Sequence, residues 1–246
     1  MLTAIAFIAL LPGALARQIT VTNNCGYTIW PAMFTAIGTA PTYPGGWEAP
    51  AGTSVTFTVP DNWSSARIWG RRGCTFTADS NSCLDGGCSG GLQCNGIGAP
   101  PATLAEFTLG GDTGTDYYDV SLVDGFNIPV SITNNVGCSV ADCPVDLGPN
   151  CPTPLRGPFD VSGNIVGCKS ACEAGLDSDT ANSPNCCTGN YSTPATCPSS
   201  GVQYYSYFKS NCPNSYCYAY DESSGTALWT CDGSKSPAYT ITFCPE

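Results

Sequence analysis

The stretch Asp116-Tyr-Tyr-Asp-Val-Ser-Leu-Val-Asp-Gly-Phe-Asn-Ile-Pro129 decides how this chain can fold. Its aromatic and aliphatic residues predict a β-strand that carries an unusual amount of negative charge. Asp119 and Asp124 have opposite parity, so a straight strand would point them to opposite faces of its sheet. They can share a site only if the chain turns between them, and Gly125 tolerates such a turn. We therefore expect the acids of this stretch to face a cleft and not the core.

Further short segments rich in β-branched and aromatic residues recur along the chain, separated by Gly, Pro, Asn and Ser. They comprise residues 17–34, 53–60, 65–74, 102–111, 116–133 and 238–245. Such spacing is typical of a β-sandwich, and no convincing amphipathic helix exceeds a few turns. The sequence predicts a mainly β fold.

The cysteines divide the chain into regions. Residues 138–212 are rich in Cys, Pro, Ser and Asn with little periodicity, which predicts a disulfide-rich lobe. Residues 74–94 are Gly-rich and would form a small loop region held by disulfides. The β-sandwich core would then comprise residues 17–137 and resume at 213–246.

The first 16 residues form an apolar run that ends in Ala14-Leu15-Ala16, a pattern that signal peptidase recognises. We interpret residues 1–16 as a signal peptide, although the usual positive charge before the run is missing. A membrane anchor is the alternative, but the run is short for a membrane span. With 17 cysteines in 246 residues, the chain is expected in an oxidising compartment, secreted to the extracellular space or the cell wall.

Charge and composition exclude several classes of function. The net charge is −11 with eight Lys and Arg residues, which argues against nucleic acid and anionic membranes as partners. Neutral polysaccharides remain possible. The chain has no histidine, so histidine-based triads, zinc sites and general bases are ruled out. We expect no cofactor, no metal site, no stable membrane insertion and a monomer.

The order of several long segments resembles the thaumatin-like proteins, pathogenesis-related family 5. The resemblance rests on ARIWGRRGC (66–74), CSGGLQCNGIGAPPATLAEFTLG (88–110), DYYDVSLVDGFNIPVSI (116–132), the pair Cys186-Cys187 and the terminal TFCP. It implies a thaumatin-like β-sandwich core with a disulfide-rich lobe and a small stapled loop region. This chain would be an acidic, secreted member.

The resemblance also implies how the cysteines pair, which spacing alone leaves open. The implied disulfides are Cys25–Cys244, Cys74–Cys83, Cys88–Cys94, Cys138–Cys231, Cys143–Cys212, Cys151–Cys168, Cys172–Cys186 and Cys187–Cys197. Cys217 is left over. A buried free thiol among tyrosines is one interpretation, and an intermolecular bridge or a reactive thiol is the other.

By the same resemblance, one Arg and four acids line a cleft between the sandwich and the lobe. They are Arg67, Glu106, Asp119, Asp124 and Asp221. Glycoside hydrolysis needs one protonated carboxylic acid and one ionised carboxylate. We assign Glu106 as the acid and Asp124 as the second carboxylate, with Asp119 as the rival, while Arg67 and Asp221 orient sugar hydroxyls.

Tyr118 and Tyr218 are expected to contact sugar rings, although core packing is the alternative for any tyrosine here. Asn62 and Asn190 begin Asn-x-Ser sequons and are candidate glycosylation sites.

The function that the resemblance implies is endo-hydrolysis of β-1,3-glucan in an acidic cleft. Three other interpretations remain: a β-glucan-binding or antifungal protein without turnover, a purely structural Arg-carboxylate network between the lobes, and a sweet-tasting or inhibitory interaction protein. Sweet members of the family are basic, so the acidity of this chain counts against that activity.

Overall fold

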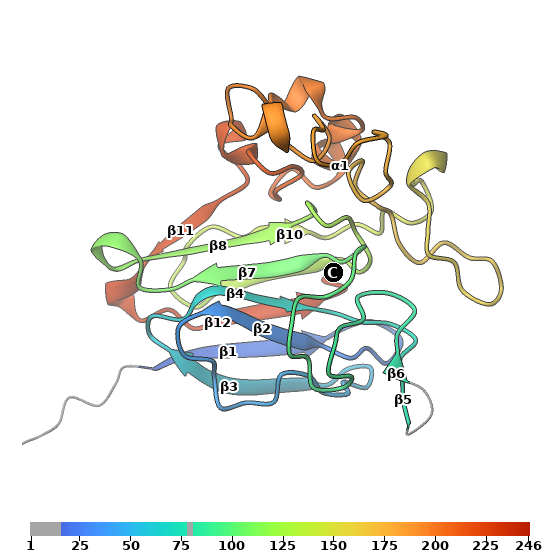
Figure 1. Ribbon diagram of the computed structural model, residues 1–246. Coiled ribbons are helices and arrows are strands. Elements are labelled where there is room, and N and C mark those ends of the chain that lie inside the picture. Colours follow the sequence, from blue (N-terminus) through green and yellow to red (C-terminus); the bar gives the residue numbers. More distant parts are fainter. Residues whose placement is uncertain (1–15, 78–80) are drawn as a thin grey trace, which may run out of the picture.

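The computed structural model describes residues 16–77 and 81–246 (Figure 1). The expected signal peptide lies outside this range, apart from Ala16, which begins the first strand. Within the described residues, no helix is long and apolar enough to span a membrane. The predicted mainly β fold is confirmed.

The first of two five-stranded sheets has the strand order β10-β9-β12-β1-β3. Its strands are β1 (Ala16–Asn23), β3 (Ser54–Pro60), β9 (Val130–Asn134), β10 (Ala141–Cys143) and β12 (Tyr239–Phe243). The two ends of the chain meet in this sheet, because β1 pairs in parallel with β12 and the Cys25–Cys244 disulfide follows. The sandwich is thereby closed by residues from opposite ends of the sequence.

The second sheet has the order β11-β8-β7-β4-β2 and carries the acidic stretch. Its strands are β2 (Ala32–Ile37), β4 (Ser64–Trp69), β7 (Leu104–Thr108), β8 (Thr115–Ser121) and β11 (Trp229–Asp232). A separate antiparallel pair of strands, β5 (Thr75–Phe76) and β6 (Asn81–Ser82), lies in the small stapled region.

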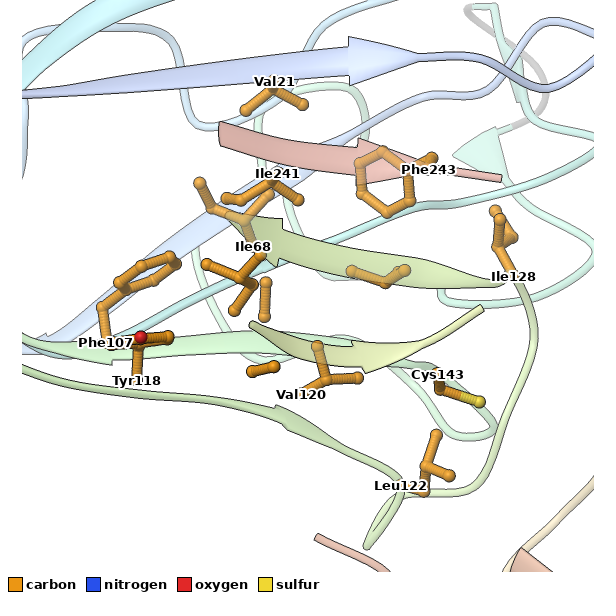
Figure 2. Close-up of a cluster of buried hydrophobic side chains, with 14 of the residues drawn as sticks. Val21, Ile68, Phe107, Tyr118, Val120, Leu122, Ile128, Cys143, Ile241 and Phe243 are labelled. Atoms are coloured by element: carbon orange, nitrogen blue, oxygen red, sulfur yellow. The ribbon is translucent and has the colours of Figure 1, made fainter. Parts of the chain in front are cut away.

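The hydrophobic core lies between the two sheets (Figure 2). Val21, Ile241 and Phe243 come from the first sheet. Ile68, Phe107, Tyr118 and Val120 come from the second. Every second residue of β8 therefore enters the core, as the alternating pattern predicts, and the residues between them face outward.

Asp116 is an exception to the expectation that the acids of the opening stretch face a cleft. It is fully buried on the core side of β8, where its carboxylate accepts hydrogen bonds from Arg17 and from the Tyr239 hydroxyl. The Gly110 backbone N–H also donates to it. A buried cation and two neutral donors replace the water that this carboxylate would otherwise need.

The lobe contains α1 (Tyr205–Asn211), the single α-helix of the described residues, and packs beside the end of β8, where Tyr216 pairs with Ser121 (Figure 1). Six short 3₁₀ segments complete the helices: η1 (Asp112–Gly114), η2 (Thr153–Leu155), η3 (Gly189–Tyr191), η4 (Ser199–Gly201), η5 (Asp221–Ser224) and η6 (Gly233–Lys235). The eight disulfides in the structure are the eight that the family resemblance implies.

The lobe in the structure has different sequence bounds from the expected range 138–212. The strand β10 pairs with β9 in the core sheet, although it lies within the range 138–212. The chain after residue 212 stays with the lobe until β11, because Asp221 is bonded to Lys209 and Tyr205 of α1. Composition marked the cysteine-rich stretch, but strand pairing and buried polar bonds decide where the lobe ends.

Candidate functional site

Three strands of the second sheet place Arg67, Glu106 and Asp119 in one row across its outer face. Arg67 on β4 is directly opposite Glu106 on β7, and Glu106 is directly opposite Asp119 on β8. Directly opposed residues in antiparallel strands have side chains on the same face and close together. The strand register thus brings together three residues that are far apart in the sequence.

A turn after β8 brings Asp124 to the same face. The Gly125 N–H donates to the Leu122 carbonyl at 2.9 Å, and Gly125 has a φ of +84°. A side chain is strained at this φ, so glycine suits the position. Asp119 and Asp124 therefore line one cleft despite their opposite parity, because the chain turns between them as the sequence predicts.

The cleft has a volume of about 400 Å³ and lies between the sheet and the lobe. From the sheet side it is lined by Arg67, Glu106, Asp119, Ser121 and Asp124. From the lobe side it is lined by Tyr216 and Glu222. The lobe is held here by backbone bonds, since Tyr216 donates to the Val120 carbonyl and accepts from the Leu122 N–H.

Arg67 joins two of the acids. One terminal nitrogen of its guanidinium lies 2.9 Å from Glu106 Oε1, and the other lies 3.5 Å from Asp124 Oδ2. Each of the three side chains keeps a quarter or more of its surface exposed, so the charges remain open to a ligand from solvent.

Burial raises the pKa of Glu106, and the neighbouring Asp124 raises it further, while Arg67 and a hydrogen bond from Ser121 oppose the shift. Asp119 is affected more strongly: burial and the adjacent Glu106 hold its pKa well above the ordinary range. Asp119 Oδ1 is buried without a hydrogen-bond partner among the described residues. Glu106 and Asp119 therefore retain a proton at pH values where exposed carboxyls have lost theirs.

Asp124 also has a raised pKa through burial, but Arg67 opposes that shift. The carboxylates of Glu106 and Asp124, which lie on either side of the Arg67 guanidinium, thus have different surroundings. Glu106 has a second acid directly opposite, whereas Asp124 lies on a turn. The site can hold one carboxyl protonated and another ionised.

Asp221 does not occupy the position that the resemblance implied. Its side chain is fully buried in the lobe, where it accepts bonds from Lys209 Nζ at 3.0 Å, the Tyr205 hydroxyl at 2.8 Å and the Cys217 N–H at 2.9 Å. Its exposed neighbour Glu222 lines the cleft and is hydrogen-bonded to Tyr216. The assignment of Asp221 to sugar hydroxyls is therefore corrected, and sequence alone could not separate two adjacent acids in a 3₁₀ turn.

The two tyrosines expected to contact sugar are buried. Tyr118 lies in the core between the sheets and donates its hydroxyl to the Ser139 carbonyl. Tyr218 packs against Tyr205 inside the lobe with ring centroids 5.4 Å apart. Strand parity was the signal that could have corrected the first choice, because Tyr117 shares the outward face with Asp119 and Tyr118 does not.

Cys217 is the one cysteine of the described residues without a disulfide, and it is buried. Burial raises the pKa of its thiol to about 12, so the thiolate is scarce. This favours the buried, unreactive interpretation. Asn62 and Asn190 are exposed, and their glycosylation stays a prediction.

Comparison with known proteins identifies the family. The family model described as "Thaumatin family" matches residues 23–245. The chain belongs to the thaumatin family. It is 44% identical to pathogenesis-related protein 5 of Arabidopsis thaliana, over 98% of this chain and 95% of that protein. It is 42% identical to thaumatin-like protein 1a of Malus domestica, over 97% and 94% of the two chains.

A solved structure shares the fold at a much lower sequence identity. The GH family 64 laminaripentaose-producing β-1,3-glucanase from Paenibacillus barengoltzii matches with a TM-score of 0.56 over 94% of this chain and 76% of that chain, at 14% identity. At this identity the likeness shows the fold alone.

Proposed function

We propose that this thaumatin-family protein is secreted, binds β-1,3-glucan in the acidic cleft and hydrolyses it. The observation that carries the proposal is the pairing of Glu106 with Asp119 beside Arg67. This pairing raises the pKa of Asp119, so the pair keeps a proton in an open cleft. Arg67 contacts both Glu106 and a further carboxylate, that of Asp124. A chain with eight disulfides fits an oxidising, extracellular setting. The proposal includes a role in defence, because the chain is 44% identical to a protein named pathogenesis-related protein 5.

In this proposal Glu106 donates its proton to the glycosidic oxygen of the leaving sugar. Its raised pKa supports the role, because a general acid must be protonated at the working pH. Asp119 lies directly opposite on β8, and Glu106 helps to raise its pKa, so the pair keeps a proton as the pH rises. Asp124, on the other side of Arg67, acts as the second carboxylate, either as a nucleophile toward the anomeric carbon or as a base for water.

The lobe supplies the opposite wall of the cleft. Glu222 and Tyr216 face the acids across the cleft. The Glu222 carboxylate would accept hydrogen bonds from sugar hydroxyls, and the Tyr216 hydroxyl could donate or accept them. Glu222 thus takes the binding role that Asp221 was expected to fill.

One observation favours a second function, glucan binding without turnover. Arg67 contacts both Glu106 and Asp124, so the acids are partly neutralised within a network that could simply hold sugar hydroxyls. The same residues would then serve binding and antifungal adhesion.

Chromatography of soluble products separates these functions. Wild type, Glu106→Gln and the exposed control Glu48→Gln are incubated with a linear β-1,3-glucan, with cellulose as a control substrate. The proposal expects oligosaccharides from wild type and Glu48→Gln and a loss of on the order of a hundredfold or more in Glu106→Gln. Binding by all three proteins without products would leave the glucan-binding function.

A further inference from the structure

A second hollow adjoins the acidic cleft on the outer face of the same sheet. It has a volume of about 340 Å³ and shares Arg67, Glu106 and Asp119 with the cleft. The row of charged residues therefore has open space on both sides.

The two hollows follow each other along the strands. The cleft is lined by β7 and β8 near Leu104 and Ser121. The second hollow is lined by the same strands near Thr108 and Tyr117. These pairs lie on opposite sides of the Glu106–Asp119 pair in the strand register. Together the hollows form one groove, which runs parallel to the strands and is crossed at its middle by the row of Arg67, Glu106 and Asp119.

Away from the charged row, the walls of the second hollow are mostly aromatic and aliphatic, with Ser65 and Thr108 as the polar exceptions. Phe34 is opposite Arg67 in the register, so its ring lies on the outer face, and Tyr117 lies two residues before Asp119 on that face. Ile97 and Leu228 form the rim and are 60% and 38% exposed. Exposed apolar side chains beside a polar row suit a ligand with both hydroxyl groups and apolar C–H faces.

We infer that the second hollow binds glucose units on the Thr108–Tyr117 side of the scissile bond, with Tyr117 as the main ring contact. The inference rests on the proposed function, since it extends the ligand of the cleft to both sides of the acids. Continuity of the two hollows through three shared residues selects one glucan chain as the occupant. A neutral ligand also suits a hollow whose far walls carry no charge.

The position of the acids within the groove has a consequence for the reaction. A chain bound on both sides of Glu106 is cleaved at an internal bond, so the products are oligosaccharides and not single glucose units. The lobe-side half supplies hydrogen bonds, and the Tyr117 half supplies stacking.

The test compares Tyr117→Ala with Tyr117→Phe and with Tyr27→Ala, which removes an exposed tyrosine outside the groove. KM and kcat are measured on a long and a short linear β-1,3-gluco-oligosaccharide. In parallel, binding of both oligomers is measured by calorimetry with each substitution placed in Glu106→Gln.

We expect Tyr117→Ala to raise KM and Kd for the long oligomer about three- to tenfold, with kcat nearly unchanged and no effect on the short one. For Tyr117→Phe and Tyr27→Ala we expect the same KM and kcat as wild type, and the same Kd as Glu106→Gln in the calorimetry.

The two proposals fail in different ways. If wild type cleaves glucan but Tyr117→Ala has the same KM and Kd as Tyr27→Ala on the long oligomer, the hollow does not bind glucose units and the inference is overturned. If no protein releases products, hydrolysis fails, and the calorimetry still decides the inference: weaker binding by Tyr117→Ala supports it, and equal or absent binding overturns it.

Discussion

Asp116 and Asp119 lie three residues apart on β8 and have opposite surroundings. Asp116 points between the sheets and is fully partnered by Arg17, Gly110 and Tyr239. Asp119 points outward beside Glu106, with one carboxylate oxygen unpartnered among the residues that the structure describes. The parity of the strand therefore makes one acid structural and leaves the other with a raised pKa.

The raised pKa of Asp119 makes a prediction about stability. A carboxyl whose pKa is higher in the folded than in the unfolded protein stabilises the fold fully below the unfolded value, about 3.9, and that contribution is lost as pH rises through the folded value. Each tenfold difference in proton affinity is worth about 1.4 kcal/mol. Asp119→Asn removes this loss, so its Tm relative to wild type should increase as pH rises from about 4 to about 8. Parallel Tm curves for the two proteins, with Glu48→Gln as control, would contradict the assignment.

Asp221 and Glu222 form a matched pair for testing burial. Asp221→Ala leaves Lys209 without its buried carboxylate and should lower the free energy of unfolding by about 3–5 kcal/mol. Glu222→Ala removes an exposed side chain and should change it by about 0.5 kcal/mol or less. Guanidinium unfolding without reductant measures both. If both variants lost the same free energy of unfolding, the buried position of Asp221 would be contradicted.

The strand β8 shows how far sequence reasoning reaches. Local composition predicts the strand and the turn at Gly125, but the choice of Tyr118 as a sugar contact did not follow the strand parity, which points that side chain into the core. Which residues lie opposite Asp119 depends on register with β7, which long-range pairing sets. Arg67 and Glu106 were therefore named through family resemblance, and Glu222 was missed because only the packing of η5 decides which adjacent acid faces the cleft.

The small stapled region depends on a buried arginine. Arg71 is fully buried and donates to the carbonyls of Trp30, Gly91 and Leu92 at 2.7–2.9 Å. No carboxylate contacts it in the described part of the chain, and burial lowers its pKa to about 10. The Arg71 guanidinium thus links the backbone of the loop that carries the Cys88–Cys94 disulfide to the Trp30 carbonyl, and Gln93 adds a bond to the Gly46 carbonyl.

Arg71→Met should loosen this loop, because several carbonyls lose their donor at a cost of about 1–3 kcal/mol each. We expect faster hydrogen exchange of amides in residues 88–95 and a lower Tm. Arg156→Met, an exposed arginine, serves as control. If exchange in the loop is the same in both variants, Arg71 does not hold it.

In the whole molecule, two sheets supply a rigid face and the lobe supplies the second wall of the cleft. This division explains why the acids can be crowded without unfolding the chain: the core lies on the other face of the sheet. The net charge of −11 further disfavours anionic ligands and is compatible with the neutral glucan proposed above.

The pH dependence of hydrolysis follows from the same groups. Activity should fall at high pH as Glu106 loses its proton, and at low pH as Asp124 gains one. Both pKa values are raised, so the limb of each group should lie above the ordinary value for its residue type, about 4.3 for glutamate and about 3.9 for aspartate. The check is kcat/KM against pH on linear β-1,3-glucan. Activity that continues to rise into alkaline pH would contradict the role of Glu106.

The most direct measurement follows the oxygen of water into the product. A long β-1,3-gluco-oligosaccharide is incubated in heavy-oxygen water with wild type, Glu106→Gln or Glu48→Gln, and released fragments are weighed by mass spectrometry. Hydrolysis at Glu106 predicts internal fragments with one heavy oxygen at the new reducing end from wild type and Glu48→Gln, and almost none from Glu106→Gln. Unlabelled oligomer throughout, or equal labelling by all three proteins, would contradict hydrolysis in this cleft.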